Sequence, residues 1–243
     1  MLGQPKRDRV AERREATRRD IIDAAWASAR ELGLAQITLR DVAERVGMRA
    51  PSLYSHLDSK HAIYDAMFAQ AWSECLEVFV QADSRCPPDR RGAVRHYART
   101  YFDFATADVV RNQLMNQRTI PGFEPSAGAY APAVAALEAL RLRMAHHGIT
   151  AQEDIDLYVA LVGGLADSQL ANDPGGNRWS RLLDRAVDMY LRDVDHQTDD
   201  ELPPRTLERT RDDHDRLQRE DRQQGQPAAA DARPEHSNPT RGG

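Results

Sequence analysis

The residues with the clearest chemical potential lie between Thr38 and Lys60, where arginine, hydroxyl and aromatic side chains flank a turn at Gly47. Such side chains donate hydrogen bonds to phosphate oxygens and to base edges, so this arrangement favours recognition of a nucleic acid. The sequence contains no GxSxG, GxxxxGK[ST] or HExxH pattern, and no GxGxxG motif follows a strand-like segment. An enzyme is therefore a weaker hypothesis than a binding protein.

Two short helices are predicted to position these side chains. Thr38 and Asp41 form a Thr-x-x-Asp capping box, which predicts a helix over residues 39–46 that ends at Gly47. A second short helix is expected over residues 50–56, because a proline is tolerated in its first turn. The pair forms a helix-turn-helix.

Longer helices are predicted on both sides of this unit. Apolar residues recur at helical spacing over residues 12–32, before Gly33. Asp58 or Ser59 can cap a further helix over about 60–82, with an apolar pair in each turn. We expect this long helix to join the unit to the rest of the chain and to act as a lever.

The combination is specific in order and spacing. It comprises Gly33, Thr38, Leu39, Asp41, Val42, Ala43, Val46-Gly47-Met48, Ser52-Leu53-Tyr54, His56-Leu57 and Ser59-Lys60. With these residues, the stretch from Thr17 to Phe68 closely resembles the DNA-binding domain of the TetR/AcrR family of transcriptional regulators. Arg49 departs from the usual Ser or Thr cap, and Leu57 replaces the usual phenylalanine. The first departure either weakens the start of the helix or adds a phosphate contact.

The resemblance implies that the second short helix enters the major groove and presents its first residues to base edges. Lys60 and the amides at the start of the long helix can form an anion site. The alternative is that Tyr54 belongs to the core and Lys60 is an ordinary surface lysine. Thr38 and Arg40 either touch the DNA backbone or serve only in capping and solvation, and the basic residues before Ile21 either grip DNA or form a solvated face. The candidates for reading sequence are Arg49, Ala50, Pro51, Ser52 and Ser55, and those for phosphate contact are Tyr54, His56 and Lys60.

Beyond this unit the chain is also predicted to be helical, because no segment alternates apolar and polar residues over a sustained length. The fold class is therefore all-α, with about nine helices. Residues 119–129 form a long loop, which either has a function or is a plain connector. The remaining helices are expected from Asp89 to about 105, near 108–117, from Pro132 to Gly148, from a capping box at Thr150 and Glu153 to about 172, and from about Asn177 to Val194.

For this second region the resemblance implies a domain that binds an effector and forms a dimer. A mostly apolar pocket predicts a small, largely apolar effector, whereas the alternative assigns the same side chains to ordinary core. The polar anchors expected are Asn116, Gln117 and Arg118. The positions of His146 and His147 are better explained by a favourable interaction with the C-terminus of their helix than by a metal site. No cofactor is expected. The pocket candidates are Trp72, Phe79, Tyr97, Tyr101, Phe104, Met115, Gln117, Phe123, Tyr130 and Tyr158.

A homodimer is expected through the helices over about 154–172 and 177–194, which is the usual family arrangement. Their apolar stripes have no other obvious partner in the sequence. The residues predicted at the interface are Leu161, Leu165, Leu183, Val187 and Tyr190. Because a ligand in the second domain can tilt the long helix, we expect it to change the spacing of the two DNA-binding units.

Composition sets the domain boundaries. The chain has 243 residues, 41% of them hydrophobic, and a net charge of −5. Residues 1–60 carry 12 basic and 9 acidic groups, whereas residues 61–195 carry 13 and 18. We predict a flexible arm over 1–11, a DNA-binding domain over 12–60 (the head), an effector and dimer domain over 61–195 (the body), and a mostly disordered tail over 196–243.

The remaining features indicate a cytoplasmic protein. The sequence has no run of eighteen apolar residues and no apolar stretch near its start, and its two cysteines are too few for a disulfide framework. The leading hypothesis is a ligand-responsive repressor that binds a palindromic operator as a dimer. The alternative is an interaction module of the same fold with weakened or lost DNA binding. The effector, the operator and the direction of regulation do not follow from the residues.

Overall fold

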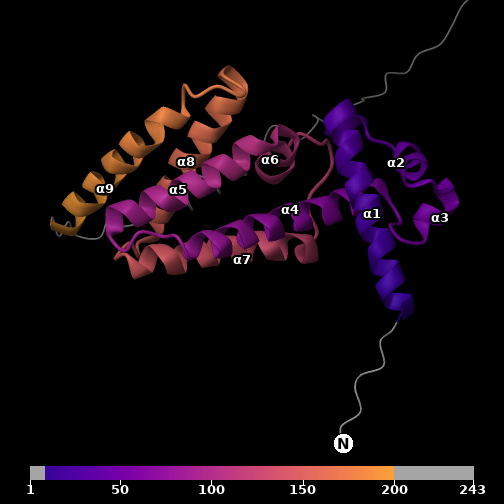
Figure 1. The fold of residues 1–243 in the computed structure, drawn as a ribbon, viewed down its shortest axis with the longest axis horizontal. Coiled ribbons are helices and arrows are strands. Elements are labelled where there is room, and N and C mark those ends of the chain that lie inside the picture. Colours follow the sequence, from indigo (N-terminus) through magenta and orange to yellow (C-terminus); the bar gives the residue numbers. More distant parts are fainter. Residues whose placement is uncertain (1–8, 200–243) are drawn as a thin grey trace, which may run out of the picture. The chain divides into compact units, whose positions relative to one another are not determined.

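The computed structural model describes residues 9–199, and all regular elements in this range are helical (Figure 1). The prediction of an all-α fold is therefore confirmed. Residues 1–8 of the predicted arm and residues 200–243 of the predicted tail lie outside the described residues. The elements are α1 (Arg9–Leu32), η1 (Leu34–Gln36), α2 (Leu39–Val46), α3 (Ala50–Tyr54), α4 (Lys60–Asp83), α5 (Arg90–Ala107), α6 (Val109–Asn116), α7 (Ala127–His146), α8 (Gln152–Asn172), η2 (Ser180–Leu182) and α9 (Leu183–Asp199).

The start of α2 follows the predicted capping box. The Asp41 amide donates to Thr38 Oγ1, and the Thr38 amide donates to Asp41 Oδ2, both at 3.2 Å. Gly47 ends the helix with a φ of 71°, a left-handed conformation that a side chain would disfavour. This local hydrogen bonding sets the direction in which the chain enters α3.

The helices of the head share one apolar core with the adjoining part of the body. Ile21, Trp26 and Leu53 are buried there together with Met67 of α4 and Leu114 of α6. Head and body belong to one compact unit. The boundary predicted after residue 60 therefore coincides with the first residue of α4, and the apolar core continues across it.

A second core joins α5, α8 and α9. Val94, Tyr158 and Leu183 are buried in it, and the partly buried Tyr101 packs against both cores. α4 packs along α7, and α5 packs along α8 (Figure 1). Arg91 and Arg95 of α5 also bind the Asp188 carboxylate of α9, with Nε–Oδ1 distances of 2.7 and 2.9 Å. These contacts fix α9 against α5.

The starts of three helices in the body differ from the prediction. α7 begins at Ala127 rather than at Pro132, because Ser126 Oγ accepts the Ala129 amide at 3.2 Å and Pro132 lies inside the helix. α8 begins at Gln152 after Ala151, so the predicted capping box at Thr150 is wrong.

The third difference concerns the start of α9, which begins at Leu183 after η2 rather than near Asn177. Gln169 Oε1 accepts the amides of Trp179 and Ser180 at 2.9 and 3.2 Å and holds the connecting turn. At the other end of the chain, α1 begins at Arg9, so residues 9–11 are helical and are not part of a flexible arm. Among the described helices, none has the length and apolar character that crossing a membrane requires.

Candidate nucleic-acid interface and effector pocket

The short helix α3 buries one face and exposes the other. Leu53 has no exposed surface and Leu57, just beyond the helix, is 3% exposed. Tyr54 is half exposed, and its neighbours on the outward side are also exposed. The exposed residues among the predicted DNA contacts are Thr38, Arg40, Arg49, Pro51, Ser52, Tyr54 and Ser55, whereas Ala50, His56 and Lys60 are partly buried. The sequence prediction thus selected a set that is mostly on the surface.

The helix itself is shorter than predicted. It ends at Tyr54, so His56 follows it in a turn. Arg49 is the N-cap residue and makes no capping hydrogen bond through its side chain, which leaves its guanidinium exposed at the start of the helix. Arg14 of α1 donates to the Ser55 carbonyl at 3.4 Å and lies beside the end of α3. The prediction did not single out Arg14, although it noted the basic residues before Ile21.

Lys60 has a structural contact that its sequence position did not reveal. Its Nζ atom donates to the Ala35 carbonyl at 2.8 Å and lies 5.6 Å from the centre of the Tyr64 ring. The Tyr64 hydroxyl donates to the adjacent Leu34 carbonyl at 2.5 Å. Both side chains of α4 therefore hold η1, which leads into α2. An ammonium group has three donors, so contact with a phosphate stays a prediction.

The body contains a pocket of about 200 Å³ between α4, α5, α7 and α8, which we call the apolar lobe. Five of the ten predicted pocket residues line it, namely Trp72, Phe79, Tyr101, Tyr130 and Tyr158. The prediction missed its aliphatic and small side chains because it considered only aromatic, sulfur and amide groups. These are Cys75, Ala133, Ala136, Leu137, Leu140, Val159 and Val162, whereas the expected polar anchor Asn116 does line the lobe.

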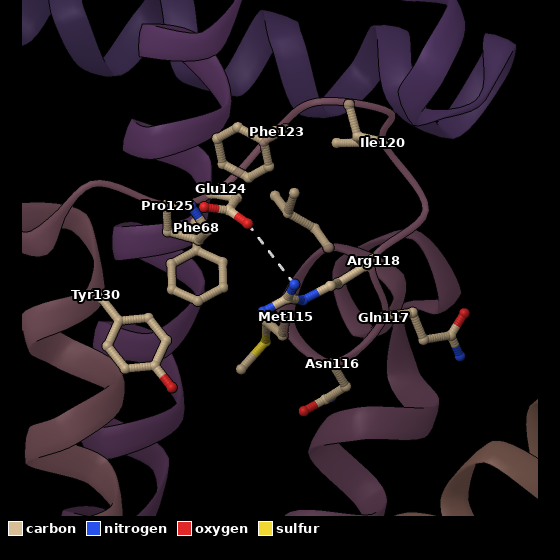
Figure 2. Close-up of a pocket in the computed structure, with 11 residues that line it drawn as sticks. Phe68, Met115, Asn116, Gln117, Arg118, Ile120, Phe123, Glu124, Pro125 and Tyr130 are labelled. Atoms are coloured by element: carbon tan, nitrogen blue, oxygen red, sulfur yellow. Dashed lines mark ion pairs between the residues drawn. The ribbon is translucent and has the colours of Figure 1, made fainter. Parts of the chain in front are cut away.

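A second pocket of about 370 Å³ lies under the segment that joins α6 to α7, and we call it the loop pocket (Figure 2). It contains the predicted Met115, Gln117, Phe123 and Tyr130. Figure 2 shows Tyr130 and Phe68 side by side, and their rings stack with centroids 5.9 Å apart. The long loop that the sequence indicated therefore forms part of a pocket wall, as do Phe68, Leu114, Asn116, Arg118, Ile120, Glu124 and Pro125.

Two predicted pocket residues lie elsewhere. The Tyr97 hydroxyl donates to Asp83 Oδ1 at 3.2 Å, and its ring packs between α4 and α5 rather than on either pocket. Phe104 is buried under the Arg111 guanidinium, which lies 3.7 Å from the ring centre. Neither side chain lines the apolar lobe or the loop pocket, and Phe104 lines a separate pocket together with Arg111, so a role of these two residues in ligand binding stays a prediction.

Burial keeps three ionisable side chains in the wall of the apolar lobe, Cys75, Tyr101 and Tyr158, neutral near pH 7. Burial raises the pKa of the Cys75 thiol to about 12, although the nearby Arg111 opposes this shift. Burial likewise raises the pKa of Tyr101 to about 12 and that of Tyr158 well above its usual value. The wall of the apolar lobe therefore presents no charge to an occupant.

A chain of amide hydrogen bonds lies beside the two pockets. The Asn112 amide nitrogen donates to Asp167 Oδ1 and the Asn116 amide nitrogen donates to Asn112 Oδ1, both at 2.8 Å. The Tyr101 hydroxyl donates to Asn116 Oδ1 at 3.3 Å. Gln117 is directed away from Phe68 (Figure 2), and its amide lies 3.4 Å from Asp167. These hydrogen bonds thus connect α5, α6 and α8.

The predicted dimer residues divide into two groups. Leu183, Val187 and Tyr190 are at most 3% exposed, because they form the core between α5, α8 and α9. They already have partners within the protomer, so placing them at a subunit interface was wrong. Leu161 and Leu165 of α8 are partly exposed, and their role at an interface stays a prediction.

Three histidines of the body contact other protein groups. His96 Nε2 lies 2.9 Å from the Ala82 carbonyl, and His146 and His147 lie at the C-terminal end of α7 with ring centroids 5.0 Å apart. Within residues 9–199, no group of three His, Cys, Asp or Glu side chains is placed to hold a metal ion.

Residues 21–67 match the sequence model of the bacterial regulatory proteins of the tetR family. The match spans the helix-turn-helix geometry described above, including the capping box, Gly47 and the first residues of α4. Over these residues the head is therefore similar to the helix-turn-helix part of the tetR family of bacterial regulatory proteins.

Solved structures with the same fold support this assignment of architecture. A protein of unknown function from Rhodococcus sp. RHA1 is 17% identical, with a TM-score of 0.64, and the match covers 73% of this chain and 94% of that one. The TetR family transcriptional regulator PfmR from Thermus thermophilus is 19% identical, with a TM-score of 0.53 and coverage of 71% and 97%. The regulator FadR from Bacillus subtilis, in complex with stearoyl-CoA, is 13% identical, with a TM-score of 0.52 and coverage of 71% and 96%. At these identities the likeness shows the two-part TetR fold alone, and no curated protein sequence matches this chain significantly.

Proposed function

We propose that this protein is a non-enzymatic, ligand-responsive repressor of the TetR family that binds a two-fold symmetric operator as a homodimer. The observation that carries the proposal is the outward face of α3, where Arg49, Ser52 and Ser55 are exposed while Leu53 is buried. A helix that buries an apolar side against its domain and exposes polar side chains on the other side can enter the major groove while it stays packed on the domain.

The side chains on this face have different roles. Arg49 and Ser52 stand at the start of α3 and are suited to read base edges, since a guanidinium binds a guanine through two hydrogen bonds. Tyr54 at the end of α3, Arg40 of α2 and Arg14 of α1 are suited to phosphates, which fix the register of the complex but not its sequence.

The dimer is proposed to form through the outward faces of α8 and α9. Leu157 is 47% exposed and Met189 is 54% exposed, and Ala160 and Gly164 follow Leu157 on the same side of α8. A side chain added at Gly164 would meet no atom of the protomer within 4 Å, so a partner helix can approach closely there. Leu161 and Leu165 border this face. It is proposed as the interface in place of Leu183, Val187 and Tyr190, which are buried within the protomer.

The loop pocket has a direct connection to the head. Phe123 lies in its wall and packs on Tyr64 of α4, with ring centroids 5.3 Å apart. Tyr64 in turn holds the Leu34 carbonyl in η1, just before α2. A ligand that displaces Phe123 therefore acts on the group that positions the helix-turn-helix.

A second connection runs through α6. Arg30 of α1 donates two hydrogen bonds to Asp108 Oδ2, at 2.9 and 2.7 Å. Asp108 also caps α6, because its carboxylate accepts the amides of Val110 and Arg111. Since α6 carries Met115 of the pocket wall, movement of this helix reaches the head without passing through the whole length of α4.

The expected response is a weaker operator complex in the presence of ligand. Allosteric coupling of about 1 to 3 kcal/mol corresponds to a change in affinity of roughly 5- to 150-fold. Half-sites one helical turn apart, about 34 Å, tolerate little change in the spacing of the two heads. Either connection, or tilting of α4, provides such a change.

The decisive experiment selects DNA from a random double-stranded library with the full chain and measures the selected sequence by fluorescence anisotropy over a range of salt concentrations. We expect an inverted repeat whose affinity falls steeply as salt rises. Ser52→Ala and Arg49→Ala should change the selected half-site, whereas Tyr54→Phe should weaken all sequences alike.

One observation favours the alternative of an interaction module without DNA binding. The five-residue α3 begins after Arg49, without the side-chain cap that stabilises such starts. Failure to retain any DNA at low salt, by a chain that is folded and dimeric, would support this alternative and contradict the proposal.

A further inference from the structure

The apolar lobe and the loop pocket meet at two side chains. Asn116 and Tyr130 line both pockets. Tyr130 is half exposed and stacks on Phe68, so its ring stands beside the loop pocket in Figure 2 and also borders the apolar lobe. One ligand can therefore occupy both pockets past these two residues.

The walls of this combined site carry almost no net charge. No residue that lines the apolar lobe has a charged side chain. The loop pocket has Arg118 and Glu124, which are both largely exposed and pair with each other at 3.7 Å across its opening (Figure 2). A charged group that enters the apolar lobe would lose its hydration without gaining a counterion, which costs several kcal/mol unless the group becomes neutral.

Hydrogen bonding fixes the orientation of the amide at the junction. A carboxylate only accepts hydrogen bonds, so Asp167 takes the amide nitrogen of Asn112 and leaves Asn112 Oδ1 to accept from Asn116. Asn116 Oδ1 then faces the Tyr101 hydroxyl. A primary amide has two donor hydrogens and two acceptor lone pairs, so Asn116 keeps one of each after these contacts.

This arrangement matches a hydroxyl group, which donates one hydrogen bond and accepts another. We propose that the effector is an uncharged molecule with an elongated apolar part and one hydroxyl group, bound with the apolar part in the apolar lobe and the hydroxyl group at Asn116. The proposal rests on the effector-binding role of the body, and it adds the chemical class that the site selects.

The test uses three probes with the same carbon chain, namely decan-1-ol below its solubility limit, and decanoate and decylammonium below their critical micelle concentrations. Their binding to the full chain is measured by isothermal titration calorimetry at pH 7. We expect decan-1-ol to bind at least about tenfold more tightly than either charged probe, because only the charged probes pay for desolvation of an ion.

Two amide variants test the role of the junction. Asn116→Ala should weaken decan-1-ol by about two- to tenfold, as expected for the loss of one hydrogen-bonding partner. Gln117→Ala is the matched control, because this neighbouring amide is directed towards Asp167 and should leave the affinity unchanged. Equal effects of the two variants would contradict the assignment of Asn116.

A third variant tests the apolar lobe. Val159 lines it and is 45% exposed, so Val159→Trp can fill the opening without disturbing the core. This variant should lose decan-1-ol binding while its circular dichroism spectrum and melting temperature stay close to those of the parent chain. Unchanged binding would place the probe outside the lobe.

Two outcomes overturn the proposal. Decanoate binding as tightly as decan-1-ol would mean that Arg118 exchanges Glu124 for an acidic ligand. Binding of none of the probes would exclude this ligand class. DNA selection with the same preparation separates these results from a failure of the proposed function, because a chain that binds an operator but no decan-1-ol remains a regulator.

Discussion

The outward faces of α3 and α8 differ in the side chains that they expose, although both helices rest on a buried apolar core. α3 presents Arg49, Ser52 and Ser55, which are short or cationic polar groups. α8 presents Leu157 and Val159, each about half exposed. The head thus offers hydrogen-bond donors to a polyanion, whereas the body offers apolar surface to a ligand or to a second copy of the chain.

The comparison shows that an apolar stripe does not by itself identify an interface. The stripe of α9 is fully used within the protomer, because Leu183 and Val187 pack against α5 and α8. The residues left for a partner are those on the opposite side, such as Met189. Substitutions on the two sides of one helix therefore separate folding from assembly.

The largest effect is expected from Leu183→Asp. A carboxylate at this fully buried position lacks a partner, so the free energy of unfolding should fall by more than about 4 kcal/mol. Urea denaturation followed by circular dichroism measures the change at a fixed protein concentration. Met189→Asp on the exposed side of α9 is the control and should stay folded; equal stability of the two variants would contradict the burial of Leu183.

Next in size is the effect of Leu157→Asp on assembly and DNA binding. In a two-fold symmetric interface the charge is introduced twice, so we expect a folded monomer by light scattering. Operator affinity should fall on the order of a hundredfold, because the second half-site no longer binds as part of the same molecule. Val134→Asp is the matched control, since Val134 of α7 is also exposed and apolar but is not part of the proposed interface. An unchanged dimer would place the interface elsewhere.

A smaller effect distinguishes two cations of the DNA-binding domain. Arg40→Ala should reduce the slope of log K against log salt by about 1 and leave stability unchanged, because its side chain is exposed and is suited to a phosphate. Lys60→Ala should also lower stability by about 1 kcal/mol, since the Ala35 carbonyl loses its donor. Thermal melting and salt titration of the operator complex measure both quantities. A salt slope that stays constant in Lys60→Ala would limit Lys60 to holding η1.

The smallest effect concerns acid stability. Hydrogen bonds from Arg91 and Arg95 hold the pKa of Asp188 well below its usual value, and burial opposes this shift. A lowered pKa in the folded state means that the stabilisation is complete above about pH 4 and is lost as pH falls further. Asp188→Asn should therefore be less stable at pH 7 and lose less stability than the parent between pH 4 and more acidic conditions. Parallel pH profiles of the melting temperature would show that the ion pairs do not contribute.

Local signals in the sequence predicted the DNA-binding domain well. Thr38, Asp41 and Gly47 determine a helix start and stop through atoms within a few residues of one another, and the structure has both as predicted. The same type of pattern failed at Thr150, because α8 begins after Ala151 and the threonine lies one residue too early to cap it. A capping pattern is thus reliable only where the backbone places its first residue at the N-cap.

Contacts between distant segments account for the errors in the body. Tyr97 and Trp72 are both aromatic residues on helices, yet only Trp72 lines a pocket, because Tyr97 pairs with Asp83 and packs between α4 and α5. No local pattern reveals which of two buried rings borders an empty space. For the same reason the aliphatic side chains of the apolar lobe, such as Val162, were missed.

The sequence by itself determined the helical fold, the similarity of the head to the tetR family and the residue types on α3, because each depends on periodicity or on the local spacing of residues. Only the tertiary structure decided which apolar faces are already buried and which remain for a partner or a ligand. It also decided that Lys60 and Tyr64 hold η1. The physical reason is that burial and hydrogen-bond partners depend on the packing of segments far apart in the chain, whereas a helix start depends on neighbouring residues alone.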